Sequence, residues 1–249
     1  VVSSSKADVY NHIPKDFQQT EGATYLHVTS NNTIYGTQWK EFPKAATYLV
    51  ADMSSDILSR KINVSDFGLI YAGAQKNMSC AGVTLAIIRK DVLGKVERSI
   101  PTMLDYATHI PEHSMFNTPP VFPIYVMNRT LAWLKENGGV SAMELLNNKK
   151  SGLLYEAIDN SKLFVGTAAK EDRSTMNVPF IFNKETVAAE KADELQKEFL
   201  AFTKERGLEQ LKGHRSVGGF RASIYNAMPM EGVEALVSAM ADFEKKILG

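Results

Sequence analysis

The sequence lacks several features that would point to particular classes of protein. It has one cysteine, Cys80, among 249 residues, which excludes an internal disulfide and fits a reducing compartment such as the cytoplasm. Lys and Arg total 28 and balance 28 Asp and Glu, so no basic excess indicates nucleic acid and no acidic tail indicates a disordered role. No apolar run approaches the ~20 residues that a membrane span needs, and the opening "VVSSSKADVY" does not have the pattern of a secretory signal.

What is present is typical of a folded α/β protein. Apolar residues make up 44% and charged residues 22%, an ordinary globular balance. His109 and His113 bracket "IPE", and no cysteine or acidic spacing around them is expected to make a metal site.

Short β-rich segments alternate with amphipathic helical ones. Strands are predicted at 23–30, 46–52, 68–73, 82–89, 162–166, 176–182 and 220–226. Helices are predicted at 119–139, 140–161, 191–207 and 230–247. Several of the first strands are continuously apolar, which predicts that both of their faces are covered. Ser141 and Glu144 form a capping-box pattern at the start of the second helix.

The pattern predicts two domains. Residues 1–140 form a strand-rich, mostly parallel sheet domain, and residues 141–249 form a smaller α/β domain. The linking helix near 140–160 lies at the boundary and can belong to both.

Asp52 and Lys76 each follow a predicted strand, in "ADMSS" and "AGAQKN". Taken singly, they can be a turn aspartate and a solvated loop lysine. Ligand sites collect at strand ends of α/β sheets, however, and a carboxylate beside an amine there suggests a pyridoxal phosphate site. The lysine would form a Schiff base with the aldehyde, while the carboxylate would pair with the pyridine nitrogen.

The block "GHRSVGGFR" places His214, Arg215 and Arg221 within eight residues, among glycines that let the backbone approach a ligand. Arginine forks suit carboxylate and phosphate oxygens. The alternative is a pair of surface arginines in a glycine-rich turn.

Five blocks in order resemble the phosphoserine aminotransferases, class V pyridoxal phosphate enzymes of the aspartate aminotransferase-like fold type I. They are "NNTIYGT" (31–37), "ADMSSDILSRKINVSDFGLIYAGAQKN" (51–77), "SMFNTPPVFPIYVM" (114–127), "DRSTMNVPF" (172–180) and "GHRSVGGFRASIYNAMPMEGVEALV" (213–237). The resemblance runs along nearly the whole chain. It implies the fold type I architecture, with part of the large cofactor-binding domain and a smaller C-terminal domain.

The resemblance implies that six residues, from two neighbouring subunits, contact the cofactor, pyridoxal 5'-phosphate. Lys76 matches the lysine that holds the cofactor, and Asp52 matches the partner of its ring nitrogen. Thr33 matches a threonine that hydrogen-bonds the ring oxygen of the cofactor. Gln75 matches a residue near the cofactor phosphate. Asn117 and Thr118 match a pair that reaches the phosphate of the neighbouring subunit, which implies a homodimer with shared active sites.

The resemblance also implies how the substrate is bound. Arg221 matches the residue that binds the substrate α-carboxylate, and His214 and Arg215 match residues that help bind its phosphate. The implied reaction moves an amino group from L-glutamate to 3-phosphohydroxypyruvate, a step of serine biosynthesis. Many bacterial members of the family also serve pyridoxine biosynthesis. The alternatives are a catalytically incomplete chain that serves only as a dimerisation module, or another pyridoxal phosphate enzyme of this fold.

Two departures from the family stand out. The family has an N-terminal stretch with a glycine-rich phosphate turn and a ring-stacking aromatic residue, which are not located in this sequence. We therefore expect a fragment that, by itself, binds cofactor poorly. Ser79 and Cys80 stand where the family usually has Gly-Pro, which predicts a looser turn after the lysine.

Overall fold

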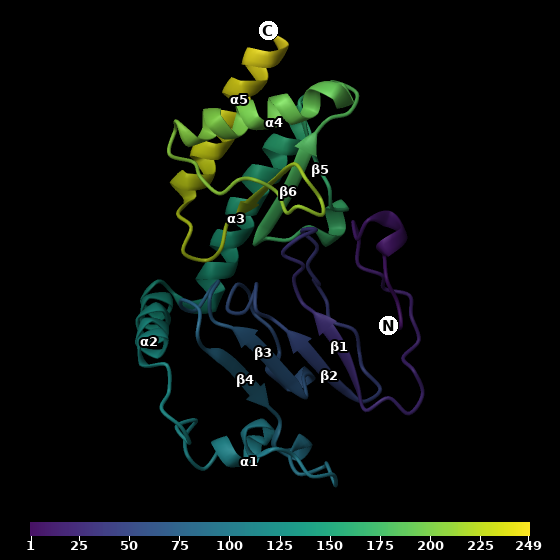
Figure 1. Ribbon diagram of the computed structural model, residues 1–249, viewed down its shortest axis with the longest axis vertical. Helices are drawn as coiled ribbons and strands as arrows, with labels where there is room; N and C mark the ends of the chain where they lie inside the picture. The colour runs from purple at the N-terminus through teal and green to yellow at the C-terminus, as the bar shows by residue number, and fades with distance from the viewer.

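The first sheet of the computed structural model, which describes all 249 residues, has four strands in the order β1-β2-β3-β4 (Figure 1). The strands are β1 (Tyr25–Thr29), β2 (Tyr48–Asp52), β3 (Leu69–Gly73) and β4 (Thr84–Ile88). β1, β2 and β3 are parallel and β4 pairs antiparallel with β3 at the edge. The four predicted strands are therefore confirmed, and the sheet is mostly parallel.

Only one face of this sheet is buried, so the prediction that both faces are covered is wrong. Burial alternates along β1, β2 and β3. Leu26, Leu49 and Ile70 point into the core, whereas their neighbours on the other face are exposed or half-buried. The apolar residues that made the runs look continuous, such as Tyr25 and Val50, lie on the open face because side chains alternate along a strand.

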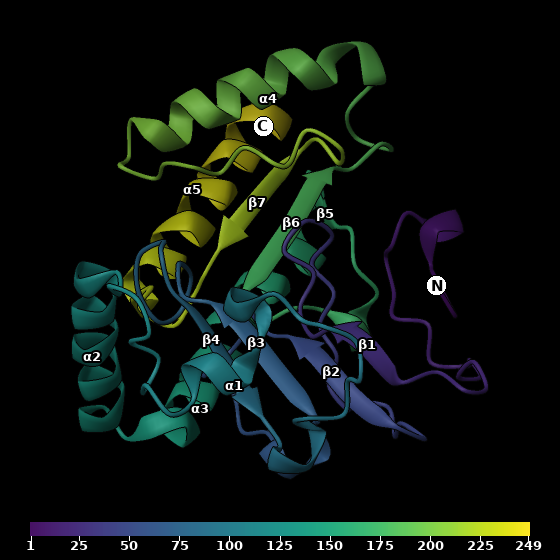
Figure 2. The same cartoon turned by 60° about the horizontal axis from the view of Figure 1, so that its bottom comes forward.

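The second sheet is antiparallel, in the order β5-β6-β7. Its strands are β5 (Phe164–Gly166), β6 (Asn177–Phe182) and β7 (Phe220–Ser223), and helices α4 (Ala189–Lys204) and α5 (Met230–Leu248) lie beside it (Figure 2). Its core is rich in phenylalanine, with Phe164 in contact with the rings of four others: Phe180, Phe182, Phe199 and Phe220. Such ring contacts add to the free energy of burial.

Two consecutive helices join the sheets: α2 (Val121–Glu136) and α3 (Gly139–Asn160). The predicted capping box is wrong, because α3 begins after Gly138, whose φ of 88° only glycine adopts readily, and no side chain caps it. Glu144 instead accepts a hydrogen bond from the backbone N–H of Lys61. The remaining elements are short: α1 (Tyr106–His109), η1 (Lys6–Asp8), η2 (Val64–Asp66), η3 (Lys90–Val92), η4 (Thr102–Leu104) and η5 (Lys170–Asp172). None of these helices combines the length and apolar character that crossing a membrane requires.

The two sheets have separate apolar cores and meet across a buried polar seam. One core is drawn from residues 26–78, the other from residues 154–243. Between them the Asn31 amide donates to Asn177 Oδ1 at 2.9 Å, and the Asn226 N–H donates to Asn77 Oδ1 at 3.1 Å. Backbone bonds also join residues 36–38 to 172–174. We call these contacts the inter-sheet seam.

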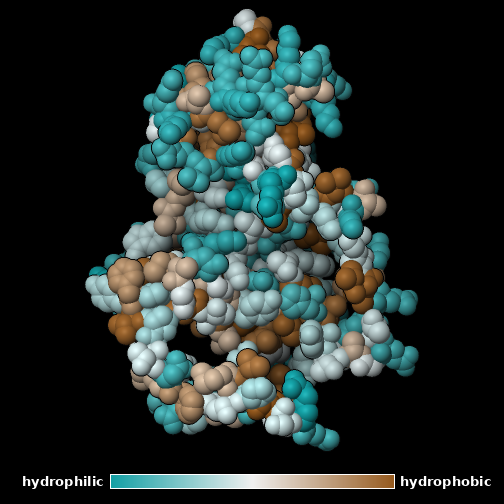
Figure 3. Space-filling model, in the orientation of Figure 1, coloured by the Kyte–Doolittle hydropathy of each residue, from teal (hydrophilic) through white to brown (hydrophobic).

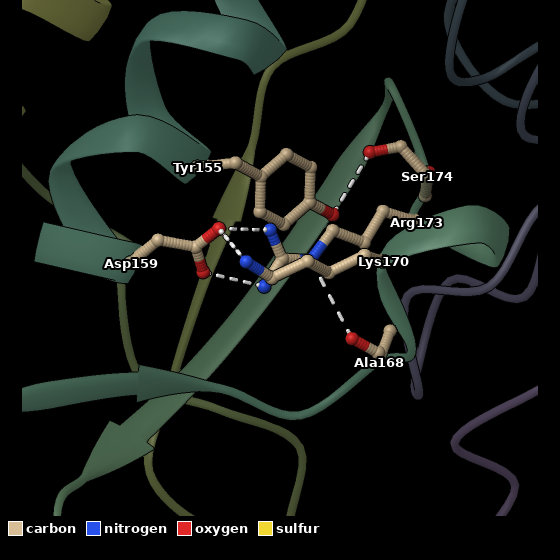
Figure 4. Close-up of polar contacts among 6 residues, drawn as sticks. All are labelled: Tyr155, Asp159, Ala168, Lys170, Arg173 and Ser174. Atoms are coloured by element: carbon tan, nitrogen blue, oxygen red, sulfur yellow. Dashed lines mark hydrogen bonds and ion pairs between the residues drawn. The ribbon is translucent and has the colours of Figure 1, made fainter.

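A charged cluster fixes the segment between β5 and β6 to α3 (Figure 4). Arg173 donates two hydrogen bonds to the Asp159 carboxylate, at 2.9 and 2.7 Å, and its guanidinium lies 4.5 Å from the centre of the Tyr155 ring. Lys170 forms a second ion pair with Asp159 at 3.2 Å. Because the backbone carbonyl of Arg173 accepts from Lys40 Nζ at 2.6 Å, the cluster also supports the seam.

Two leucines in α3 provide a matched test of the second core. Leu154 is fully buried and Leu145 is 73% exposed. We expect Leu154→Ala to lower the free energy of unfolding by about 2–5 kcal/mol, through lost burial and a residual cavity. Leu145→Ala should change it by about 0.5 kcal/mol or less. Chemical denaturation of both variants checks this, and equal losses would contradict the described packing.

The Asp159–Arg173 pair predicts an acid-sensitive contribution to stability. Hydrogen bonding to Arg173 lowers the pKa of Asp159. The pair therefore stabilises the fold above the unfolded-state pKa of about 3.9 and loses this effect as the pH falls through the folded-state pKa. Asp159→Asn should be less stable at pH 7 by roughly 1 kcal/mol. The two stability curves should converge as the pH falls through the folded-state pKa of Asp159. Parallel curves, or the same convergence for the exposed control Asp16→Asn, would count against this role.

Candidate active site

The candidate site lies where β2 and β3 end. Asp52 is the last residue of β2, and Lys76 follows β3 by three residues. Ser54 N–H donates to Asp52 Oδ1 at 2.9 Å, and the Asp52 carbonyl accepts from both the N–H and the hydroxyl of Ser30. The carboxylate is thus held at the carboxyl end of the parallel strands, where ligand sites of such sheets occur.

Thr33 holds the lysine side chain. Lys76 Nζ donates to Thr33 Oγ1 at 2.7 Å. Thr33 belongs to a tight turn in which Asn32 Oδ1 accepts from two backbone N–H groups and Gly36 has a φ of 74°. A Cβ at Gly36 would lie 2.2 Å from Pro179 Cδ, so this turn packs against the second sheet only with glycine there.

Arg221 reaches the same threonine from the second sheet. It is the second residue of β7, and its guanidinium NH1 donates to the Thr33 carbonyl at 3.3 Å. Its Nε is buried without a hydrogen-bond partner. One threonine therefore contacts both cations: Lys76 through its hydroxyl and Arg221 through its carbonyl.

The surroundings lower the pKa of Lys76. Burial is the largest cause, the positive charge of Arg221 is the next, and the Asp52 carboxylate opposes both. Desolvation and a like charge disfavour the ammonium form. The site thus increases the fraction of neutral amine, which is the nucleophilic form.

The other residues singled out from the sequence lie at varying positions. Gln75 is exposed and its amide lies over Gly73, where an added Cβ would be 2.6 Å from Gln75 Oε1. His214 and Arg215 lie on the turn before β7, where the Ser216 N–H donates to His214 Nδ1 at 3.2 Å.

That turn requires glycine at its base, because a Cβ at Gly213 would lie 1.9 Å from the Gly218 carbonyl oxygen. Asn117 and Thr118 are exposed in the segment before α2. None of His214, Arg215, Asn117 and Thr118 forms a hydrogen bond to Lys76, Thr33 or Arg221. Hydrogen bonds join Thr33 to Lys76 and Arg221, and the charge of Asp52 acts on Lys76, whereas no such contact includes the other four residues.

The sequence did not single out Tyr71, which is a neighbour of Asp52, or His27, which contacts Tyr71. Tyr71 is paired in register with Asp52, and its hydroxyl lies 3.0 Å from His27 Nε2. Burial and the nearby Asp52 carboxylate raise the pKa of Tyr71. The period-two alternation that puts these side chains on the open face with Asp52 is the signal that identifies them.

The turn after Lys76 is not loose, so that prediction is wrong. Ser79 N–H donates to the Ala74 carbonyl at 2.7 Å, and the Ser79 hydroxyl donates to the Pro123 carbonyl at 2.7 Å. Ser79 therefore ties the turn to the start of α2, while Cys80 is exposed.

Arg221 also borders a cavity beside the second sheet. A cavity of about 560 Å³ lies between residues 207–212, β7 and α5. Arg221 lines it, but Lys76 and Asp52 do not.

Comparison with known proteins gives a consistent result. The profile of the family "Aminotransferase class-V" matches residues 11–236. The phosphoserine aminotransferase of Parabacteroides distasonis is 55% identical over 99% of this chain and 68% of that protein. Among solved structures, phosphoserine aminotransferase from Bacillus circulans subsp. alkalophilus has a TM-score of 0.92 at 46% identity, covering 99% of this chain and 67% of that one.

A third relative was solved with a cofactor. Phosphoserine aminotransferase from Trichomonas vaginalis, described as bound to PLP, has a TM-score of 0.85 at 43% identity, covering 90% of this chain and 62% of that chain. The chain thus spans about two thirds of the length of the relatives that it matches.

The charges around Lys76 predict opposite effects of two substitutions. Arg221→Gln should raise the pKa of Lys76 and slow its labelling by an amine-reactive reagent at pH 8, because a neighbouring positive charge is removed. Asp52→Asn should lower that pKa and speed labelling. Mass spectrometry of the Lys76 peptide measures both rates against the exposed Lys191. Changes in the same direction for the two variants would contradict the assignment, and Arg206→Gln is the surface control.

Proposed function

The chain belongs to the class-V aminotransferases, whose cofactor is pyridoxal phosphate, and from this premise we propose the reaction of the whole protein. It transfers the amino group of L-glutamate to 3-phosphohydroxypyruvate, giving O-phospho-L-serine and 2-oxoglutarate. This is a step of serine biosynthesis, and a related phosphorylated substrate would extend it to pyridoxine biosynthesis. The proposal is supported by relatives at about 55% identity that are phosphoserine aminotransferases.

The observation that carries the proposal is the contact of Lys76 and Arg221 with one threonine. Thr33 accepts from Lys76 Nζ through its hydroxyl and from Arg221 through its carbonyl. This places an amine of lowered pKa beside a guanidinium that can bind a carboxylate. An α-amino acid whose carboxylate pairs with Arg221 would present its Cα near Lys76.

The residues present fit pyridoxal phosphate. Lys76 is half-buried with a lowered pKa, Asp52 lies on the open face at the end of β2, and Thr33 offers a hydroxyl between the sheets. The unpartnered Nε of Arg221 adds a buried donor that an anionic ligand can satisfy. When bound, the cofactor supplies an aldehyde that takes the amino group and a ring that accepts the electrons of the Cα–H bond.

The side chains of this chain supply the remaining chemistry. Asp52 holds a proton at the ring nitrogen, and Thr33 orients the amine of Lys76. Lys76 in its neutral form would remove the proton from the substrate Cα as a general base. As a general acid it would then deliver that proton to the carbon on the other side of the transferred nitrogen, which is the former aldehyde carbon of the cofactor. Arg221 fixes the α-carboxylate through paired hydrogen bonds, which keeps the Cα–H bond near Lys76.

We assign the substrate phosphate to His214 and Arg215. Both side chains lie on the glycine-rich turn that leads into β7 and therefore into Arg221. Two positive or donating groups on one turn suit a phosphate, and Arg221 suits the carboxylate. This division favours a substrate that carries both anionic groups.

We propose that the protein is a homodimer in which Asn117 and Thr118 contact the cofactor phosphate of the neighbouring subunit. Gln75, next to Lys76 in the chain, would lie near the cofactor phosphate of its own subunit. Apolar side chains gather on the surface around the 103–125 segment and α2 (Figure 3). Exposed large residues there include Leu104, Phe116 and Phe122. An apolar patch of this kind indicates a protein–protein contact. We place the enzyme in the cytoplasm, in keeping with its single free cysteine.

Lys76→Ala tests the proposed chemistry. The wild-type chain incubated with pyridoxal phosphate should develop a visible band, and borohydride should fix the cofactor to the Lys76 peptide. Lys76→Ala should abolish both and lower amino transfer about 10³-fold or more. Lys191→Ala is the control. Attachment of the cofactor to a different lysine in the wild-type chain would refute the assignment.

Arg215→Ala tests the substrate assignment separately. It should raise the KM for 3-phosphohydroxypyruvate about tenfold or more, because a charge-assisted bond to the phosphate is lost. The half-reaction with L-glutamate, which has no phosphate, should keep its rate. Steady-state and single-turnover kinetics separate the two, with Arg206→Ala as control. Equal effects on both half-reactions would place Arg215 elsewhere in the mechanism.

A further inference from the structure

Lys150 is a fully buried lysine in the middle of α3, with no exposed surface. Its Nζ donates three hydrogen bonds, to the carbonyls of Ile224 at 3.2 Å, Tyr225 at 2.8 Å and Met228 at 3.0 Å. These acceptors use all three protons of the ammonium group. The lysine thus binds one short segment, residues 224–228, which joins β7 to α5.

The buried ammonium has no carboxylate partner. No ion pair includes Lys150, and burial lowers its pKa to about 8. A buried charge without a counterion is unfavourable, and apolar replacements of buried charges often increase stability. The position of Lys150 is therefore poorly explained by stability alone, and its three bonds point to a role in holding the 224–228 segment.

Asn226, within that segment, contacts three other parts of the chain. Its N–H donates to Asn77 Oδ1 at 3.1 Å, and its Nδ2 donates to the Leu58 carbonyl at 3.0 Å. Its Oδ1 accepts from Asn147 Nδ2 at 2.9 Å. Asn147 lies one helical turn before Lys150, so the same face of α3 holds the segment at two points.

Asn77 continues the connection to the active site. It is 6% exposed, and its Nδ2 donates to the Ile57 carbonyl at 3.1 Å. Its neighbour in the chain is Lys76. The other end of the 224–228 segment begins directly after β7, which carries Arg221.

We propose that Lys150 and Asn226 are positioning residues that hold Lys76 and Arg221 in register with each other. Lys150 fixes the segment that follows β7, the strand of Arg221. Asn226 in that segment is hydrogen-bonded to Asn77 and so fixes the position of Lys76, the residue before Asn77. Neither residue touches the substrate. The kinetic part of this inference rests on the proposed aminotransferase function, while the positional part does not.

Lys150→Met and Asn226→Ala test the inference in the cofactor-free and the cofactor-loaded protein. Both variants should fold, as judged by circular dichroism and thermal unfolding, and Lys150→Met removes the charge while keeping an unbranched side chain. The pH profile of Lys76 labelling should shift in both. In the loaded enzyme, the pH midpoint of the visible band should shift, and kcat should fall about tenfold or more.

Coupling between the two residues is a sharper readout. In the double variant Lys150→Met/Asn226→Ala, the shift of the Lys76 labelling profile and the fall in kcat should be no larger than in the more affected single variant. This is because both residues act through one segment. Fully additive effects would overturn the shared role.

Lys149→Met is the matched control. Lys149 is the neighbour of Lys150 in α3, but its side chain is exposed. It forms no hydrogen bond to the 224–228 segment, so its replacement should leave the Lys76 labelling profile at the wild-type value. Identical profiles for Lys150→Met, Lys149→Met and the wild type would overturn the proposal.

Two further comparisons keep the outcome decisive. If Lys150→Met does not fold, Asn77→Ala removes the acceptor of the Asn226 N–H and leaves the Lys150 bonds in place. An unchanged Lys76 profile in that variant overturns the proposal. If wild-type Lys76 takes up no cofactor, the proposed function fails, but the labelling comparison still decides whether Lys150 positions Lys76.

Discussion

The constraint on which this structure depends is that its two sheets meet through hydrogen bonds rather than through a shared apolar core. The apolar clusters of residues 26–78 and 154–243 are separate, and buried amides lie between them. Apolar contacts tolerate sliding, whereas a buried donor left without its acceptor has a large free-energy cost. The seam therefore stabilises one relative placement of the two sheets much more than placements in which the sheets are displaced.

That placement determines the candidate site. Lys76 and Asp52 follow strands of the first sheet, while Arg221 comes from the second, and Thr33 contacts both cations across the seam. The pKa of Lys76 is lowered partly because Arg221 is brought close to it, so the chemistry of the lysine depends on inter-sheet geometry. A seam built from directional bonds suits a site whose charges must stay at fixed separations.

Much of the fold was predictable because hydrophobic periodicity is local. All seven predicted strands and four predicted helices occur close to their expected positions. The capping box failed because Gly138, with its positive φ, already ends the preceding turn and starts α3. The covered-sheet prediction failed because an apolar residue such as Val50 can lie on a face that no described element buries, and strand sequence alone does not say which face is covered.

The sequence by itself determined the elements, the family and the residue types available for chemistry, because these depend on local pattern and on recognisable motifs. The tertiary structure alone decided that Thr33 lies between Lys76 and Arg221, residues separated by 145 positions in the chain. It also placed Tyr71 beside Asp52 and in contact with His27. It also decided that Lys150 is buried and hydrogen-bonded to the 224–228 segment, whereas a lysine in the middle of a helix is usually solvated. Burial and long-range hydrogen bonds set these roles, and neither is encoded in the spacing of neighbouring residues.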